Sequence, residues 1–431
     1  MRRPHPVLPS GATMPSNTEL LAVAKRRLYA NYKPAPFVVA RGKGCELFDL
    51  DDERWLDLCA GVAVSSVGHA HPALSRVIAE QAATLMHTSN YFYNEPNILL
   101  AVELTRRTGM DRAFFCNSGT EACEALLKLA RHHFYGLGDK GRNRIIAFHN
   151  AFHGRTMGAL SMTGTPKYRE GFGDLGGVTH VTYGKIDEVK KAMGKDVAAV
   201  IVEPLQGEGG VFPPPTGFLK ALRTLCDENG ALLLLDEVQT GLGRLGRFLG
   251  SDGLGIQADA IALAKGLGGG FPIGAMLTSE KVAGALPPGT HGSTFGGNAL
   301  ASAAALAVLK IIDDEKLVEG AKTKGEALGK MLDELCAEIP EVCECARGEG
   351  LLRGLVLRDG YVARGVLPIV QENGVLLTAA GDRVLRFSPP LVVTIAELEE
   401  GVRAVRIACE QLASGDRSSE TMTAAKPAIR S

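Results

Sequence analysis

The sequences ALLLLD at residues 231–236 and ADAIALAKGLGGG at residues 258–270 decide the fold. Each contains a short apolar run that ends in a turn, which is typical of a buried strand in a parallel sheet. The first run ends at Asp236, and the second ends at Lys265, directly before a glycine-rich turn. Because open α/β sheets bind ligands at the carboxyl ends of their strands, we expect Asp236 and Lys265 to meet at one ligand-binding edge.

An aspartate and a lysine delivered side by side to a sheet edge suit pyridoxal 5'-phosphate. The lysine amine can form a Schiff base with the aldehyde of this cofactor. The carboxylate can pair with the pyridinium nitrogen, which makes the ring an electron sink. Taken alone, Lys265 is equally compatible with a surface lysine, and Asp236 with a helix cap. The two residues together favour the cofactor site.

The middle of the chain repeats the order strand, turn and helix. Strands are expected at residues 113–116, 144–148, 197–202, 231–235 and 258–264. Amphipathic stretches at residues 121–135 and 217–229 are expected to form helices between some of them. This alternation predicts an α/β fold with a mainly parallel central sheet and helices on both faces.

The two ends of the chain differ from the middle. Residues 37–57 alternate in polarity around a hairpin tip at residues 51–53, and Pro72 opens a helix predicted at residues 72–84. After about residue 300, helices are expected at residues 298–313 and 321–339, followed by short strands near residues 351–357 and 384–387. This pattern predicts a smaller α+β domain.

We therefore expect five segments in chain order. They are a disordered tail at residues 1–17, an N-terminal segment at 18–75 that joins the small domain, a large domain at 76–312, the small domain at 313–413 and a disordered tail at 414–431. Residues 1–17 have no apolar core of the kind that secretory signals carry, although an organellar transit segment remains an alternative.

Composition narrows the classes of partner. The formal net charge of −1 over 431 residues gives no electrostatic reason to expect nucleic acid or an acidic membrane surface as a partner. Apolar stretches are too short or too interrupted to span a membrane. The nine cysteines, mostly in apolar surroundings, indicate reduced thiols in a reducing compartment, and we expect a cytoplasmic enzyme.

Residues 117–121 follow a predicted strand and open a predicted helix. Ser118, Gly119 and Thr120 offer backbone N–H groups and hydroxyls at that helix N-terminus, where anions such as phosphate bind. The alternative is a capped helix that binds nothing.

Aromatic and charged residues follow two other strands. In the turn at residues 152–156, Phe152 can stack on a flat cofactor and Arg155 can clamp a carboxylate. Glu208, beyond the next strand, needs a basic partner, and Arg386 in the C-terminal domain is the candidate. The alternatives are a solvated arginine and an exposed acid.

Two other motifs are interpreted as turns. Residues 241–246, GLGRLG, match a dinucleotide-binding pattern, but residues 236–239 separate them from the preceding strand, so we reject that interpretation. His69 and His71 flank Ala70, which is a weak metal signal, and we expect no metal site.

Together these motifs resemble the class III (ω-) aminotransferases of fold-type I. The resemblance extends from about residue 32 to about residue 409. It is carried by the motifs at residues 68–72, 117–121, 152–156, 203–210, 236–241, 265–274 and 291–298.

The resemblance implies a role for each matching position. Lys265 corresponds to the Schiff-base lysine that carries the proton, and Asp236 to the partner of the ring nitrogen. The cofactor-binding positions are Ser118, Gly119, Thr120, Phe152, Asp236, Glu237, Val238, Gln239, Lys265 and Thr294, and the substrate-binding positions are Tyr32, Arg155, Glu208, Ser293 and Arg386.

Some of these positions imply partners. Ser293 and Thr294 correspond to a loop that reaches the other subunit's site, which implies a homodimer with composite active sites. Glu208 and Arg386 correspond to a gate that masks a positive charge for half of the cycle. Cys123 departs from the family, whose members often carry Asn or Gly at this position.

Within the family, the resemblance is greatest to members that act on N2-acetylornithine. It implies transfer of the terminal amine of that donor to 2-oxoglutarate. The alternatives are ornithine, succinylornithine, succinyl-diaminopimelate or 4-aminobutyrate as the donor, an aminomutase on the same scaffold, and a non-catalytic binding protein. Retention of both Lys265 and Asp236 counts against the last alternative.

Overall fold

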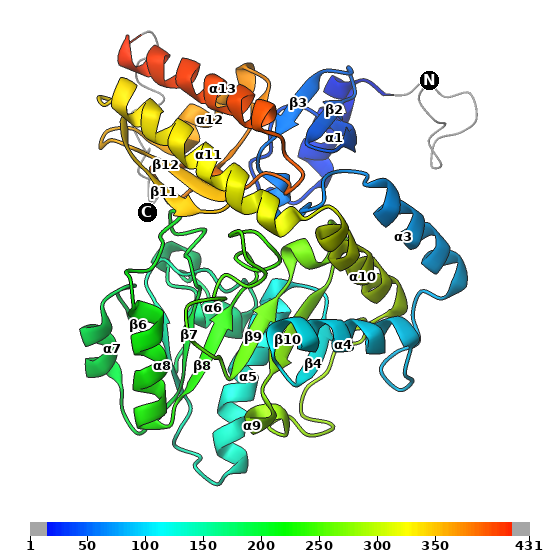
Figure 1. Ribbon diagram of the computed structural model, residues 1–431, viewed down its shortest axis with the longest axis vertical. Coiled ribbons are helices and arrows are strands. Elements are labelled where there is room, and N and C mark those ends of the chain that lie inside the picture. The colour runs from blue at the N-terminus through cyan, green and yellow to red at the C-terminus, as the bar shows by residue number, and fades with distance from the viewer. Residues whose placement is uncertain (1–14, 416–431) are drawn as a thin grey trace.

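The computed structural model describes residues 15–415, whose strands form three sheets. Figure 1 shows a large sheet in the lower half of the molecule, the C-terminal strands with α11 and α13 at the upper left, and the N-terminal strands at the upper right. Within residues 15–415, no helix has the length and apolar character needed to cross a bilayer. All nine cysteines are free thiols, as predicted.

The large sheet has seven strands in the order β4-β10-β9-β8-β7-β5-β6. All are parallel except β10, which runs antiparallel to both neighbours. Their bounds are β4 (Arg112–Cys116), β5 (Arg144–Phe148), β6 (Val178–Val181), β7 (Val197–Val202), β8 (Leu232–Asp236), β9 (Ala260–Leu263) and β10 (Gly274–Thr278). The five predicted strands and the mainly parallel sheet are thus confirmed.

Two strands of this sheet were not predicted. β6 is a half-exposed edge strand with polar residues, and β10 opens with Gly274, shortly after Pro272 and the glycine-rich turn at residues 266–270. Neither carries the continuous apolar run that marks a buried parallel strand. Their place in the sheet comes from pairing with neighbours that are already ordered.

Helices cover both faces of the large sheet. On β8, Leu232 and Leu234 belong to the apolar core that contains α5 (Gly119–Gly136). Leu233 and Leu235 belong to the opposite core, with α8 (Phe218–Asn229) and α10 (Ala299–Asp314). Successive strand side chains point to opposite faces, so Asp236 lies on the α5 side of the sheet.

The N-terminal part supplies helices and a small sheet. Its elements are α1 (Asn17–Arg27), β1 (Val39–Lys43), β2 (Glu46–Asp49), β3 (Arg54–Asp57), α2 (Ala60–Ala63), α3 (Pro72–Thr84) and α4 (Glu95–Thr108). The predicted hairpin tip and the helix opened by Pro72 are confirmed. β13 (Val375–Leu376) comes from far along the chain and pairs in parallel with β3.

The C-terminal part forms the third sheet, in the order β11-β12-β15-β14. Its elements are α11 (Leu317–Glu338), β11 (Cys343–Glu349), β12 (Leu352–Leu357), α12 (Ala363–Glu372), β14 (Thr378–Ala380), β15 (Val384–Phe387) and α13 (Ile395–Ala413). Short elements elsewhere are α6 (Met157–Met162), η1 (Pro166–Tyr168), α7 (Ile186–Ala192), η2 (Lys265–Gly268) and α9 (Glu280–Ala283).

The predicted tails each need a correction at their inner end and are otherwise untested. At the C-terminal end, Ser414 caps α13 and its N–H donates to Glu410 O, so ordered chain extends past residue 413. Asn17 opens α1, and Ser16 caps it with a reciprocal hydrogen-bonded box to Glu19, so ordered chain begins before residue 18. The rest of the predicted N-terminal tail, and residues 416–431 of the C-terminal one, lie outside the described residues. The boundaries at residues 75 and 312 stay predictions.

Candidate active site

The carboxyl ends of four parallel strands surround one cavity of about 440 Å³. It is lined by residues 152–155 after β5, by Glu203 and Glu208 after β7, by Asp236, Val238 and Gln239 at the end of β8, and by Lys265 after β9. The start of α5 closes another side. The expected meeting of Asp236 and Lys265 at one edge is therefore present.

The Asp236 carboxylate lies at the buried side of this cavity, 3% exposed. Its Oδ2 accepts hydrogen bonds from His153 Nδ1 at 2.7 Å and Cys123 Sγ at 3.2 Å, and its Oδ1 accepts one from Val238 N at 3.0 Å. Burial acts to raise the pKa of Asp236, but the hydrogen bond and charge of His153 outweigh it and lower the pKa. Asp236 is thus held as an anion.

His153 and Cys123 are contacts for which the sequence assigned no role. Burial acts to lower the pKa of His153, but Asp236 outweighs it and raises the pKa, so the buried pair is favoured in its ionised form. Ligand-type atoms of Cys123, His153 and Asp236 lie within 4.8 Å of one another. Hydrogen bonds that converge on Asp236 account for this cluster. Cys123 stands four residues after Gly119 on one helix face, which is the signal that could have revealed it.

Lys265 begins η2 in a left-handed backbone conformation, with φ at 42°. Such a conformation is strained for a residue with a side chain and is often found at functional sites. Burial, followed by the charge of Arg386, lowers the pKa of Lys265 to about 8. Within residues 15–415, no hydrogen bond or ion pair engages its amine. The amine is therefore available as a nucleophile.

The N-terminus of α5 borders the cavity through Gly119 and Thr120. A Cβ on Gly119 would lie 2.7 Å from Val238 Cγ1, so only glycine fits there. Helix N–H groups and the helix dipole favour an anion at this position. Ser118, also predicted here, instead caps the helix and bonds to Glu121, and its side chain does not line the cavity.

The side chains of the residues after Asp236 point in two directions, some into the cavity and one away from it. Val238 and Gln239 line the cavity, and Gln239 Nε2 is buried without a hydrogen-bond partner among the described residues. The Glu237 side chain points elsewhere and accepts hydrogen bonds from Gly250 N and Ser251 N at 2.8 Å each. Its side chain thus does not line the cavity, because successive side chains at a strand end face opposite sides, and a contact of Glu237 with the cofactor stays a prediction.

Residues 28–408 match the family model for aminotransferase class III.

The chain belongs to the class III aminotransferases.

Relatives support this assignment over nearly the whole chain. The acetylornithine aminotransferase of Myxococcus xanthus is 48% identical over 392 residues, which cover 90% of this chain and 97% of that protein. The succinylornithine transaminase of Salmonella enteritidis is 43% identical over 391 residues, covering 90% and 95%. The crystal structure of the ornithine aminotransferase from Toxoplasma gondii superposes with a TM-score of 0.89 at 33% identity, covering 94% and 97%.

The residues of this class III aminotransferase fit its cofactor, pyridoxal phosphate. Asp236 would offer a buried anion to the ring nitrogen, and Lys265 would offer a free amine to the aldehyde. The unpartnered Gln239 Nε2 can donate to an oxygen on the ring, and the start of α5 can receive a phosphate. Phe152 lines the same cavity, as its predicted stacking role requires.

Two arginines of the aminotransferase lie near this cavity: Arg155 lines it, whereas Arg386 lies behind its wall and contacts the lining residue Glu208. Arg155 is exposed, and its Cζ lies 4.0 Å from the centre of the Tyr168 ring. Arg386 is buried, and its Nη1 donates to Glu208 Oε2 at 2.9 Å. The predicted pairing of Glu208 with Arg386 is thus present. Tyr32 lies at the exposed rim of the cavity, 82% exposed.

The remaining predicted residues do not reach this cavity. Ser293 Oγ accepts hydrogen bonds from Asn117 Nδ2 at 3.2 Å and Gly296 N at 3.0 Å, and Thr294 is exposed in the same loop. Neither lines the wall around Lys265 of its own chain. A role for them in another subunit's site stays a prediction.

Glu203 is a further cavity residue without a sequence-derived role. It is buried beside Asp236, and burial is the main cause that raises its pKa to about 8. Its Oε2 accepts a hydrogen bond from Phe152 N at 3.3 Å. The carboxyl group therefore supports the loop that carries Phe152 while adding little negative charge at neutral pH.

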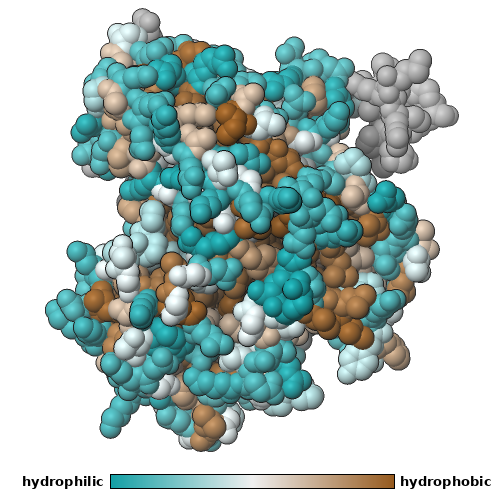
Figure 2. Space-filling model, viewed as in Figure 1, coloured by the Kyte–Doolittle hydropathy of each residue, from teal (hydrophilic) through white to brown (hydrophobic). Residues whose placement is uncertain are grey.

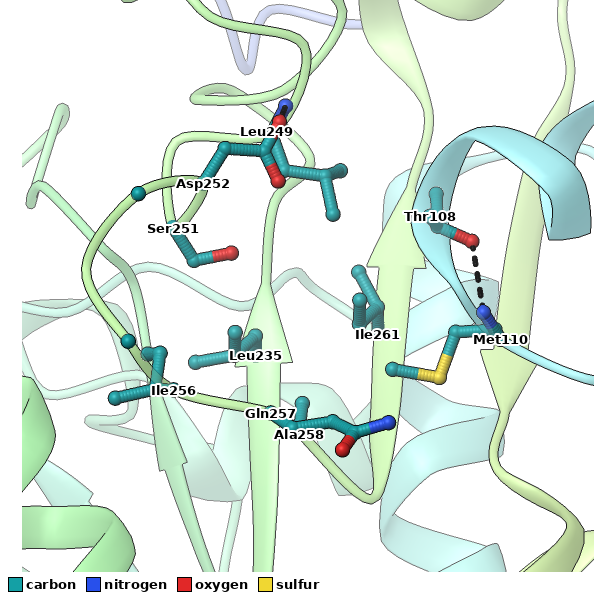
Figure 3. Close-up of a pocket in the computed structure, with 12 residues that line it drawn as sticks. Thr108, Met110, Leu235, Leu249, Ser251, Asp252, Ile256, Gln257, Ala258 and Ile261 are labelled. Carbon is teal, nitrogen blue, oxygen red and sulfur yellow. Dashed lines mark hydrogen bonds between the residues drawn. The ribbon is translucent and has the colours of Figure 1, made fainter.

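Size alone does not locate the active site. A larger cavity of about 560 Å³ lies on the other face of β8 and β9, where Leu235 and Ile261 point into one space (Figure 3). Asp252 is the charged side chain in its wall, and its carboxylate accepts a hydrogen bond from Leu249 N at 2.8 Å. The smaller cavity, with its convergent titratable groups and shifted pKa values, has the features of a catalytic site.

Proposed function

We propose that the protein transfers the terminal amine of N2-acetyl-L-ornithine to 2-oxoglutarate, giving N-acetyl-L-glutamate 5-semialdehyde and L-glutamate. This is a step of arginine biosynthesis. The name of the Myxococcus xanthus relative, at 48% identity, supports this donor. The observation that carries the proposal is an exposed arginine, Arg155, in the cavity wall together with a buried arginine, Arg386, that is ion-paired to the lining residue Glu208.

Each side chain at the centre has a distinct task. Pyridoxal phosphate, when bound, supplies an electron sink for the charge left when a proton leaves the carbon that bears the amine. Lys265 Nζ provides the attachment point and then moves that proton. Asp236, fixed by His153 and Cys123, holds a negative charge for the ring nitrogen.

The two substrates place their carboxylates differently. N2-acetylornithine reacts at its terminal amine, so its α-carboxylate lies far from Lys265, where Arg155 can bind it. 2-Oxoglutarate reacts at the carbon beside a carboxylate, which needs an arginine close to Lys265. Arg386 is close enough for its charge to lower the pKa of Lys265, and Glu208 neutralises it when it is not needed.

Succinylornithine is the second candidate donor. The relative from Salmonella enteritidis, 43% identical, is named for that substrate. The two donors differ only in the acyl group, which lies away from both the reacting amine and the α-carboxylate. Residues that bind the acyl group therefore decide between them.

We also propose that the enzyme is a homodimer with composite active sites. Tyr91, Phe92 and Tyr93 are at least 70% exposed, and Ile98 and Leu99 are exposed on the following helix α4. Figure 2 shows hydrophobic side chains gathered in the region of α4. A contiguous apolar patch of this kind is typical of an interface, and a second copy of the chain would cover it.

Steady-state kinetics of the purified holoenzyme test the donor. With 2-oxoglutarate as the acceptor, kcat/KM is compared for N2-acetylornithine, succinylornithine, ornithine and 4-aminobutyrate. The proposal expects the first to be highest, and a value tenfold higher for another donor would replace it.

Subunit mixing tests the composite site. Lys265→Ala and Thr294→Asp chains are each expected to be inactive, whereas an equal mixture should recover about a quarter of wild-type activity, because half of the dimers then hold one intact site of two. A mixture that stays inactive while forming dimers would show that Thr294 serves its own subunit.

A further inference from the structure

Tyr168, at the end of η1, contacts Arg155, which lines the cavity. The Arg155 guanidinium stacks on the Tyr168 ring, with Cζ 4.0 Å from the ring centre. The same ring meets Phe152 edge to face, with centroids 6.1 Å apart at 88°. The Glu208 carboxylate is near enough for its charge to act on the Tyr168 hydroxyl. Burial is the main cause that raises the pKa of Tyr168, and the charge and hydrogen bond of Glu208 add to it.

The contact with Arg155 has an orienting effect. Within residues 15–415, Arg155 forms no ion pair with a carboxylate, so aromatic faces are the main groups that hold its guanidinium. A guanidinium stacked on a ring keeps its N–H groups free at the edge of its plane. Stacking therefore fixes Arg155 without using the donors that bind a carboxylate.

The contact with Glu208 matters when the ion pair opens. In the structure, Glu208 accepts a hydrogen bond from Arg386 Nη1 at 2.9 Å, and it lies close enough to Tyr168 for its charge to raise the pKa of that hydroxyl. Once Arg386 turns to a substrate carboxylate, Glu208 loses its cationic partner. A partly buried carboxylate left without a donor is costly, and the hydroxyl of Tyr168 is the donor that stays.

We propose that Tyr168 is a positioning residue for both substrates: its ring orients Arg155 for the donor carboxylate, and its hydroxyl retains Glu208 while Arg386 binds the acceptor. This inference rests on the proposed function, because it assigns the two arginines to different substrates. Tyr168 acts through Arg155 and Glu208 and has no part in the proton transfer itself.

Two substitutions separate the ring from the hydroxyl. Tyr168→Phe keeps the stacked ring and removes the hydroxyl, whereas Tyr168→Leu removes both. Each half-reaction is measured separately on the holoenzyme by single-turnover changes in the cofactor absorbance, with N2-acetylornithine for the first and 2-oxoglutarate for the second.

The expected results differ between the half-reactions. Tyr168→Phe should leave the apparent Kd for the donor within about twofold and raise that for 2-oxoglutarate about tenfold, since a charged group loses one hydrogen bond. Tyr168→Leu should also raise the donor Kd about fivefold, the scale of one cation–π contact. Limiting rates at saturation should change little in both variants.

Tyr135 provides the matched control, because it is an exposed tyrosine on α5 whose ring lies 5.4 Å from Lys140 Nζ. Tyr135→Phe and Tyr135→Leu should leave both half-reactions unchanged. Thermal unfolding of all variants checks the fold, and Tyr168→Phe, which keeps the ring, remains informative if the Leu variant is unstable.

Equal effects of Tyr168→Phe on both substrates, or none on 2-oxoglutarate, would overturn the proposal. If the wild-type enzyme prefers another donor, the proposed function fails instead. The same comparison of Tyr168 variants then still applies with the preferred donor, so the two failures are distinguishable.

Discussion

Arg155 and Arg386 carry the same guanidinium group, but one is exposed and without an ion pair among the described residues, whereas the other is buried and ion-paired. Arg155 stands on a loop after β5, exposed and held by aromatic faces. Arg386 lies within β15, 2% exposed, and bonds to Glu208 and to Thr378 Oγ1 at 3.1 Å. The comparison teaches that burial and pairing, not residue type, decide when an arginine is available to a substrate.

The largest effect is expected from a variant that abolishes the proton transfer on which both half-reactions depend. Lys265→Ala should lower both half-reactions by at least about 10³-fold, because the amine that moves the proton is lost. Rapid-quench measurement of each half-reaction checks this. Comparable losses in both would show that the arginines act around a common centre, and activity near wild type would place that centre elsewhere.

The next effect is confined to the acceptor. Arg386→Lys keeps the charge but loses the planar fork, and we expect kcat/KM for 2-oxoglutarate to fall about 100-fold, in line with disruption of a buried charged contact. The kcat/KM for N2-acetylornithine should change less than about fivefold in the same variant. An equal fall in both half-reactions would contradict the division of roles.

The complementary variant should act on the donor. Arg155→Lys is expected to lower kcat/KM for N2-acetylornithine about 20-fold, less than for Arg386, because water screens an exposed contact. Kinetics with 2-oxoglutarate provide the internal control and should remain close to wild type. If kcat/KM falls more for 2-oxoglutarate than for N2-acetylornithine, the roles of Arg155 and Arg386 are the reverse of those proposed.

The smallest effect concerns pH. Burial and the charge of Arg386 lower the pKa of Lys265 to about 8, so the fraction of Lys265 in the neutral amine form rises with pH. Incorporation of the cofactor into the apoenzyme should therefore accelerate about fivefold from pH 7 to pH 8. Arg386→Met removes the positive charge that opposes protonation, so this rise should move to higher pH. Arg155→Met should leave the profile in place, and a shift of equal size there would contradict the comparison.

Much of the fold follows from local sequence. The runs before Asp236 and Lys265 are continuously apolar, and hydrophobic burial makes such runs central strands whatever the rest of the chain does. β10, β6 and β13 lack that signal, since they are short, polar or begin with glycine. Their positions depend on neighbours distant in the sequence.

The site divides in the same way. Motif and strand order together pointed to Lys265, Asp236 and the Glu208–Arg386 pair. They did not indicate the hydrogen bonds from His153 and Cys123 to Asp236, or the contact of Tyr168 with Arg155. The Glu237 side chain leaves the cavity because alternate side chains leave the strand in opposite directions, and only the tertiary structure showed this.

The sequence by itself determined the sheet, its ligand-binding edge and the residue types delivered there, because apolar periodicity and turn chemistry are properties of short segments. Only the tertiary structure decided which side chains touch, and hence that one arginine is masked while another is exposed. Those contacts join β5, β7, β8, η1 and β15, and the distances between such elements are set by packing over the whole chain.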